Sequence, residues 1–335
     1  MMSLCFDSQR GLVGSEPRGG LRASRALWGA LWGALWGALW LALWLALSLA
    51  LLGHAYAACG DGVRDGVELC DDGNLYNCDT CTNTCQIGPN LQMVTLPGGT
   101  FTMGDPLVSI ARPTRAVTLS PFQVSRNEIT VSQYRLCVKA GRCVAPALTT
   151  GCRYTAAAGA NDSQPINCVS WLQAQDFVRW CSAPDRPAMA LPSEAQWEYL
   201  ARGRQALYYP TGSAAPSLLE ASYARSATTA ACEVGTRSLG ALRVQGPFEL
   251  CDLAGNVVEL TQDNYVAPYS AAHPTNGAPM VVTSGTLKDY VVIRGGSYSS
   301  RLTSHLASAY RLNALKTTRA AILGFRVSCP VVNGA

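Results

Sequence analysis

The cysteines constrain what this chain can fold into more than any other feature of its sequence. The chain has 335 residues and 14 Cys, of which 13 follow residue 58. Five of these lie between Cys59 and Cys85, and eight lie between Cys137 and Cys329. Two of the three His lie in the same part of the chain, which excludes sites built from several imidazoles. Many Cys beside few His favour disulfides in an oxidising compartment over zinc sites.

The first 57 residues are typical of an export signal. Four Arg precede an uncharged run, Leu27 to Leu52, in which a Trp recurs at every fourth position. The run ends at Ala55-Tyr56-Ala57, a small-x-small pattern of the kind that signal peptidase cleaves. We therefore expect residues 1–57 to be a signal peptide, and the rest of the chain to reach the periplasm, cell surface or extracellular space. An uncleaved N-terminal anchor in a membrane is the alternative, because the run exceeds the roughly 20 residues that span a bilayer.

The remaining chain is nearly neutral, with 22 Lys and Arg against 20 Asp and Glu. Sequence-independent binding to nucleic acid needs concentrated positive charge, so we expect no nucleic-acid partner. The length after the signal is enough for one large domain and one small module.

Residues 58–86 are the predicted small module. They contain five Cys, six acidic residues and one Arg, with almost nothing apolar to bury. Such a segment holds a shape only through disulfides, with or without a bound cation. The acidic side chains would suit Ca²⁺, a hard cation, and a solvated loop without metal is an equal alternative. Cys78 is the expected odd thiol, and the pairing of the others is left open.

A four-Cys frame surrounds Asp71-Asp72-Gly73-Asn74 in this module. The frame consists of Cys59, Cys70, Cys81 and Cys85. This arrangement resembles short cysteine-rich repeats of bacterial surface proteins.

Residues 87–335 are predicted to form an α+β domain with few helices. Alternating apolar residues predict strands at 93–96 and 101–104, with a turn between them. A Ser or Thr followed three residues later by Gln predicts three helix starts. These pairs are Thr130 with Gln133, Ser170 with Gln173, and Ser193 with Gln196. The first helix is expected to stop at Gly141 and the third at Gly203, and the rest to be short strands and loops.

Most of the eight Cys in this domain are expected to be paired. They are Cys137, Cys143, Cys152, Cys168, Cys181, Cys232, Cys251 and Cys329. A local bridge between Cys137 and Cys143 is possible because they bracket a helix end, and other partners are equally allowed.

Seven segments of the large domain occur in the order found in one known family. They read MVTLPGGTFTMG, NEITVSQYRLCV, PINCVSWLQAQDFVRWC, LPSEAQWEYLARG, LCDLAGNVVEL, VIRGGSYS and LGFRVS. From residue 91 to about 329 the chain thereby resembles formylglycine-generating enzyme (sulfatase-modifying factor) domains. The resemblance implies an irregular fold of the C-type lectin kind.

The enzymes of that family oxidise a Cys in exported sulfatases, using O₂ and a copper ion held by two thiolates. Those thiolates follow a Gly-Gly-Ser motif, and the matching positions here are Ser300 and His305. Soft thiolates favour Cu(I), whereas a hydroxyl does not, so copper is not expected and no residue is assigned as catalytic. Arg294 and Arg326 flank the expected cleft. Either could hold an acidic ligand, and Arg326, which ends a Gly-Phe-Arg segment, is interpreted instead as a structural ion pair.

The resemblance also implies a structural Ca²⁺ site. Asp252 and Glu259 would supply carboxylates, and Gly255 and Val257 would supply backbone carbonyls, which together make an oxygen shell suited to Ca²⁺. The alternative is a turn that these carboxylates stabilise by hydrogen bonds without metal.

Three functions remain open from the sequence. The first is an exported binding or scaffolding protein without the copper-binding Cys pair, whose ligand is an unknown protein, peptide or glycan. The others are a family oxidoreductase with different chemistry, and formylglycine generation on sulfatases at an atypical site. A deep cleft with polar groups around Ser300 and His305 would favour chemistry or ligand capture, and a filled surface would favour a scaffold.

Overall fold

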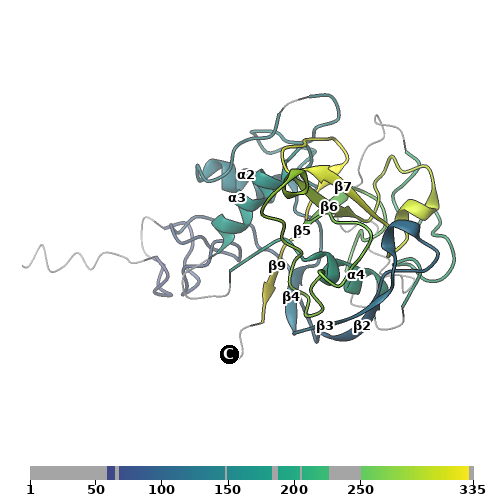
Figure 1. Ribbon diagram of the computed structural model, residues 1–335. Helices are drawn as coiled ribbons and strands as arrows, with labels where there is room; N and C mark the ends of the chain where they lie inside the picture. The colour runs from purple at the N-terminus through teal and green to yellow at the C-terminus, as the bar shows by residue number, and fades with distance from the viewer. Residues whose placement is uncertain are drawn as a thin grey trace, which may run out of the picture. The chain divides into compact units, whose positions relative to one another are not determined.

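The three α-helices in the described part of the chain are labelled in Figure 1, and each begins at a predicted capping box. They are α2 (Val131–Lys139), α3 (Trp171–Cys181) and α4 (Glu194–Arg202). In each, the first hydroxyl accepts a hydrogen bond from the backbone N–H of the Gln three residues on, and that Gln side chain accepts one in return. Gly203, with φ of 58°, ends α4. The local sequence therefore determines where these helices begin.

The structure is a computed structural model that describes residues 59–64, 68–147, 149–182, 188–203, 206–225 and 250–331. The predicted signal peptide or anchor (1–57) and Cys232 lie outside these residues. None of the helices within these ranges is long and apolar enough to cross a membrane.

The strands form three small sheets. The first has the order β1 (Met93–Leu96), β4 (Phe122–Ser125), β9 (Ser328–Pro330). The second pairs β2 (Gly99–Met103) with β3 (Arg115–Leu119). The third has the order β7 (Arg311–Leu315), β6 (Tyr290–Arg294), β5 (Val258–Asn264), β8 (Leu323–Gly324), and its β5–β8 pair is parallel. The short 3₁₀ helices are η1 (Ser109–Ala111), η3 (Thr286–Asp289) and η4 (Thr303–Leu306).

The two strands predicted first, β1 and β2, are confirmed but belong to different sheets. Gly98 separates them with φ of 67°, and a Cβ on this residue would lie 2.3 Å from the carbonyl oxygen of Leu119. The backbone of the turn therefore packs directly on the end of β3, which takes β2 away from β1. Few helices and several small sheets together agree with the predicted α+β class.

Two apolar clusters form most of the core. In one, Tyr134 of α2 and Phe177 of α3 contact Phe325, with the rings of Tyr134 and Phe177 stacked at 5.8 Å. In the other, Trp197 and Tyr199 of α4 are fully buried among residues of β2, β3 and β4. The helices are thus held by aromatic contacts between segments far apart in the chain.

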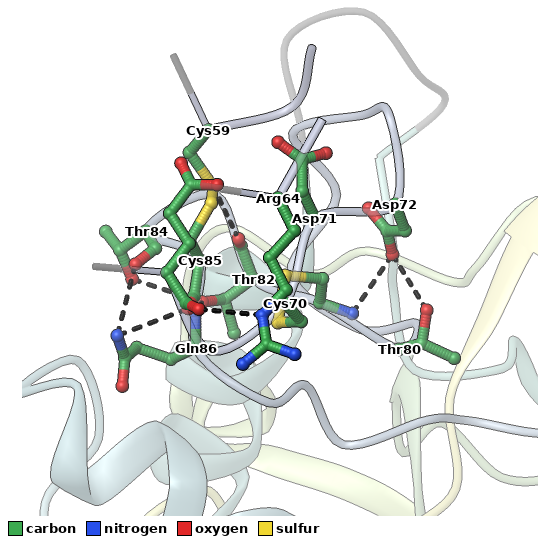
Figure 2. The surroundings of a disulfide bond; sticks show 12 residues. Cys59, Arg64, Cys70, Asp71, Asp72, Thr80, Thr82, Thr84, Cys85 and Gln86 are labelled. Atoms are coloured by element: carbon green, nitrogen blue, oxygen red, sulfur yellow. Dashed lines mark hydrogen bonds between the residues drawn. A yellow bond between two sulfur atoms is a disulfide. The ribbon is translucent and has the colours of Figure 1, made fainter. Parts of the chain in front are cut away.

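The cysteine-rich segment is closed by two disulfides, Cys59–Cys85 and Cys70–Cys81 (Figure 2). The carboxylate of Asp71 accepts hydrogen bonds from three backbone N–H groups of the same segment, at 2.8–2.9 Å. Asp72 accepts from the Thr80 hydroxyl and from the N–H of residue 81. These two carboxylates therefore stabilise their own loop, in the way that Asp side chains shape turns.

Cys78, expected to be the odd thiol of the segment, instead forms a disulfide with Cys181 at the end of α3. The side-chain amide of Asn77 donates a hydrogen bond to the carbonyl of Trp180 at 2.8 Å, which places the two thiols together. The cysteine-rich segment and the larger region belong to one compact unit. The expectation for Cys78 was wrong because it allowed disulfides only within the cysteine-rich segment or only within the larger region, and not between the two.

Four other Cys of the larger region pair locally. The local bridge between Cys137 and Cys143 is confirmed, and a second bridge joins Cys152 and Cys168. Cys251 is a buried thiol, and the thiol of Cys329 donates a hydrogen bond to Gln123. Of the seven Cys of this domain that the structure describes, five are thus in disulfides, as most were predicted to be.

Candidate functional site

A pocket of about 420 Å³ opens where the chain leaves β6, and both Ser300 and His305 line it. Its walls come from the end of β6, the loop at 295–302, η4, and the residues around Tyr310 and Ile322. Two positions that the sequence singled out are therefore brought to one cavity.

Gly296 allows the two sides of the pocket to approach. Its φ is +68°, and a Cβ there would lie 2.9 Å from the His305 carbonyl oxygen and 3.2 Å from the Ser300 hydroxyl. The Ser300 hydroxyl accepts a hydrogen bond from the N–H of Ser297 at 3.0 Å, which fixes its direction. A residue larger than glycine would be strained and would push against both walls.

The polar side chains that line the pocket are serine hydroxyls, the imidazole of His305, the phenol of Tyr310, and the guanidinium groups of Arg294 and Arg301. The ring of His305 stacks on Tyr310 with 4.8 Å between centroids and 25° between planes. Hydroxyls of Ser297 and Ser299 lie 3.1 Å apart on the opposite part of the lining. An aromatic platform beside several hydroxyls offers a ligand both stacking and hydrogen bonds.

Arg294 holds the backbone that carries Tyr310, the residue whose ring stacks on His305. Its guanidinium is fully buried and donates to the carbonyl oxygens of Ser308 at 3.1 Å and Tyr310 at 2.7 Å. The charge is compensated by Glu198 and Glu194 of α4, the latter at 3.3 Å. The acidic ligand considered for Arg294 therefore has no support, because its guanidinium is engaged within the core.

A network of buried charges continues from Glu194. Arg311 makes two hydrogen bonds of 2.6 Å to its carboxylate, and Tyr269 donates a third at 3.2 Å. Burial raises the pKa of Glu194, but Arg311 and Arg294 outweigh it and hold the pKa below its ordinary value. Burial, aided by the charge of Glu194, raises the pKa of Asp263 to about 7. Sequence reasoning missed this network, because Glu194 is also an ordinary acidic residue in the first turn of a helix.

The ion pair predicted for Arg326 is present. Arg326 donates to both carboxylate oxygens of Glu259, at 2.6 and 2.7 Å, and the indole N–H of Trp197 donates to the same group at 2.8 Å. All three side chains are buried. The acidic-ligand alternative for this arginine therefore has no support, since its guanidinium is engaged within the core.

Glu128 was not singled out in the sequence but lies beside the predicted Ca²⁺ ligands. Its carboxylate accepts hydrogen bonds from the Asn256 side chain at 2.5 Å and the Val257 N–H at 3.1 Å. Burial raises the pKa of Glu128 well above its ordinary value, and the charges of Asp252 and Glu259 raise it further. An acid at position 128 could only be placed here by the fold, because 128 residues separate it from Asn256.

The turn at 252–259 concentrates acidic groups in the core. Its three neighbouring buried carboxyls, those of Glu128, Asp252 and Glu259, share the positive charge of Arg326. Gly255 adopts φ of +89° where a Cβ would lie 2.1 Å from a backbone oxygen, so the backbone turns tightly beside Asp252. Carboxyls and backbone carbonyls are the ligand types that a hard cation takes. Within the described residues, the ligand atoms of these three carboxyls do not all lie within 4.8 Å of one another.

Comparison with known proteins places most of the chain in one family. Residues 80–329 match the model of the family described as "Sulfatase-modifying factor enzyme 1-like domain". The formylglycine-generating enzyme of Streptomyces coelicolor is 27% identical over 255 residues, which cover 61% of this chain and 78% of that enzyme. The structure of PvdO from Pseudomonas aeruginosa superimposes with a TM-score of 0.61 and 26% identity, covering 72% of this chain and 95% of PvdO.

A further relative matches this chain over only a small part of its own length. The serine/threonine-protein kinase Pkn1 of Chlamydia trachomatis serovar L2 is 34% identical over 151 residues. These cover 44% of this chain and 21% of the kinase, so this chain matches about a fifth of that relative.

Proposed function

This chain belongs to the family of sulfatase-modifying factor enzyme 1-like domains, and we propose that it is an exported member that binds a ligand in the pocket of Ser300 and His305 instead of oxidising one. The lining of that pocket is the observation that carries the proposal. The described residues that line it supply hydroxyls, an imidazole, two guanidinium groups and apolar side chains, and none of them is a Cys. By resemblance to the family motif, Ser300 and His305 stand where the family enzymes have the two thiols that hold copper.

The chemistry of these two side chains argues against the oxidase reaction. A serine hydroxyl stays protonated near neutral pH, so it has neither the charge nor the softness that Cu(I) selects. His305 is one imidazole, stacked on Tyr310, and one neutral ligand holds a copper ion weakly. The pocket keeps its shape without the ligands that the family's reaction needs.

The same pocket supports ligand capture. The stacked rings of His305 and Tyr310 present an aromatic face, and Leu302 and Leu312 add exposed apolar surface at the rim. Arg301 is exposed and brings positive charge to the entrance. These features suit a polar ring or side chain of a protein, peptide or glycan.

The remaining parts of the proposal concern location and architecture. We propose that residues 1–57 direct export or anchor the chain, that residues 58–86 form a bacterial cysteine-rich repeat, and that residues 87–335 have a C-type-lectin-like fold. The disulfides of the described residues support export, because such bonds persist in oxidising compartments. The irregular arrangement of small sheets supports the lectin-like architecture.

We also propose that Ca²⁺ supports the fold at the turn beside the pocket. Asp252 and Glu259 would hold the ion with the carbonyls of Gly255 and Val257, and the ion would supply charge compensation to the buried carboxylates. Gly255 donates its N–H to the carbonyl of Gly295, at the start of the pocket loop, so the turn and the loop support each other. The role of the Ca²⁺ ion would be structural.

A peptide with a Cys-x-Pro-x-Arg core tests the proposal directly. Purified protein is incubated with the peptide, Cu(I) and O₂, and mass spectrometry follows conversion of the Cys. We expect none, and turnover by the unmodified protein would contradict the proposal. The double variant Ser300→Cys with His305→Cys is expected to bind copper more tightly than the unmodified protein in competition with a Cu(I) chelator.

Binding is measured separately with the same peptide carrying a fluorescent label. Ser300→Trp fills the pocket and is expected to abolish any change in anisotropy, whereas Ser304→Trp is the matched control. Ser304 is exposed and lies next to His305 in η4 without lining the pocket. If neither the unmodified protein nor the control binds the peptide, sulfatase-like peptides are excluded as the ligand.

A further inference from the structure

A second and larger hollow, of about 860 Å³, lies between the cysteine-rich segment and the C-terminal ends of α2 and α3. Leu69 and Ile87 line it from the side of the cysteine-rich segment. Lys139, Arg142 and Arg179 line it from the helices. We call this hollow the repeat–helix groove. It is separate from the pocket at Ser300, with which it shares no lining residue.

The floor of the repeat–helix groove is fixed covalently. The disulfide Cys78–Cys181 joins its two walls, and the hydrogen bond from Asn77 to the Trp180 carbonyl lies beside that disulfide. On the wall itself, the N–H of Leu69 donates to the carbonyl of Cys85 at 3.1 Å. The groove is therefore preformed, and a ligand need not order its walls when it binds.

The charge of the repeat–helix groove is positive although the cysteine-rich segment is acidic. Asp176 is the one acidic residue in the described lining, and it forms an exposed ion pair with Arg179. Lys139 and Arg142 are both exposed and leave an excess of positive charge. The acidic Asp71 faces its own loop and is not part of the lining.

The opposite wall is apolar and rich in amides. Leu69 is 54% exposed and Ile87 is 63% exposed, which is unusual for large apolar side chains that share one groove. Asn83 and Gln86 are exposed beside them and offer amide groups to a peptide backbone. A groove with cations on one wall and apolar side chains on the other matches a chain that carries carboxylates and apolar residues.

We propose that the repeat–helix groove binds an extended acidic peptide with apolar side chains, and that the cysteine-rich segment is one wall of this binding site. A purely anionic glycan would use Lys139 and Arg142 but would leave Leu69 and Ile87 without apolar contacts. An acidic peptide uses both walls, and its charge complements the excess of Lys and Arg. The cysteine-rich segment then has a function of its own in recognition.

The test uses a fluorescein-labelled decapeptide of alternating Glu and Leu, with a Lys–Leu decapeptide as the opposite-charge probe. Fluorescence anisotropy is measured with the full chain. Lys139→Glu combined with Arg142→Glu is expected to weaken binding of the Glu–Leu peptide about tenfold or more, and added salt is expected to weaken it as well. Leu69→Ser with Ile87→Ser, which leaves the charges intact, is expected to weaken it also.

The matched control reverses two exposed charges outside the groove, Lys288→Glu with Arg319→Glu, and is expected to leave binding unchanged. Circular dichroism shows whether each variant is folded. Equal binding of the Lys–Leu peptide, absence of binding by the Glu–Leu peptide, or equal loss in the control would each overturn the proposal. Binding that heparin displaces and that survives Leu69→Ser with Ile87→Ser would assign the groove to an anionic glycan instead.

Discussion

The guanidinium of Arg294 donates a hydrogen bond to the backbone carbonyl of Tyr310, the residue whose ring stacks on His305. The same guanidinium is held by Glu198 of α4. A fully buried ion pair therefore connects a helix in the core to the aromatic platform of the pocket. Substitutions in α4 should reach the pocket through this connection.

Glu198→Gln is expected to destabilise the fold by about 3–5 kcal/mol, because it leaves Arg294 buried with less compensating charge. The carboxylate also accepts hydrogen bonds from Arg202 at 3.1 Å and from the N–H of Gly104 at 2.6 Å, which the amide would satisfy only in part. Urea denaturation measures the loss. Asp176→Asn, which breaks an exposed pair with Arg179, is the control and should cost at most about 1 kcal/mol. Equal effects of the two substitutions would refute the role of burial.

The stability of the fold should depend on pH through Asp263. Its folded pKa of about 7 lies above the ordinary value of 3.8, because the carboxyl is buried near Glu194. The native state therefore holds a proton that the unfolded state has released, and the stability from this group falls as pH rises from about 4 to about 7. Above pH 7 its contribution is constant.

Asp263→Asn should remove this dependence. The unfolding free energy of the unmodified protein minus that of the variant is expected to fall as pH rises from 5 to 8. Glu194 and Arg311 face the same carboxyl. Because the pKa of Glu194 is lowered, the stability that Glu194 contributes is lost only below about pH 4.5, which lies outside this window. His273, whose burial lowers its pKa, titrates in both proteins and cancels in the difference. Parallel pH profiles of the two proteins would contradict the prediction.

Calcium at the turn of Asp252 should be visible in thermal unfolding. A ligand bound only to the folded state at 100 times its dissociation constant adds about 2.7 kcal/mol, so EGTA should lower the melting temperature by several degrees. Asp252→Ala should abolish this response, and Asp72→Ala, in the cysteine-rich segment, should keep it. A melting temperature that EGTA leaves unchanged would assign the carboxylates of Asp252 and Glu259 to hydrogen bonds of the turn alone.

The disulfide between Cys78 and Cys181 should contribute strongly to stability, because it closes a long loop of 103 residues. Cross-links over loops of this size typically add about 2–5 kcal/mol. Cys78→Ser with Cys181→Ser should lose that amount in urea denaturation. Cys251→Ser removes a buried thiol without breaking a cross-link and is the control. Peptide mapping without reduction should recover the two residues in one linked pair; alkylation of either thiol would show that the pair does not form.

The sequence predicted those features that short segments specify. The capping box at Ser193 lies within four residues, so α4 began where the pattern placed it. Ser300 and His305 are close in the chain and follow the Gly-Gly-Ser motif, and both line the pocket. The contact between Glu194 and Arg311 spans 117 residues, and no local pattern distinguishes such a partner from a solvated charge. The pairing of Cys78 failed for the same reason.

The bridge from Cys78 to Cys181 also limits how this gene could have been assembled. Repeats with an even number of Cys can be gained, lost or exchanged between genes without consequence for their neighbours. This segment contributes five Cys, and the fifth completes a bond in the adjoining domain. A descendant that inherited either part alone would lose this cross-link and be left with an unpaired Cys78 or Cys181. The two parts are therefore expected to be inherited together.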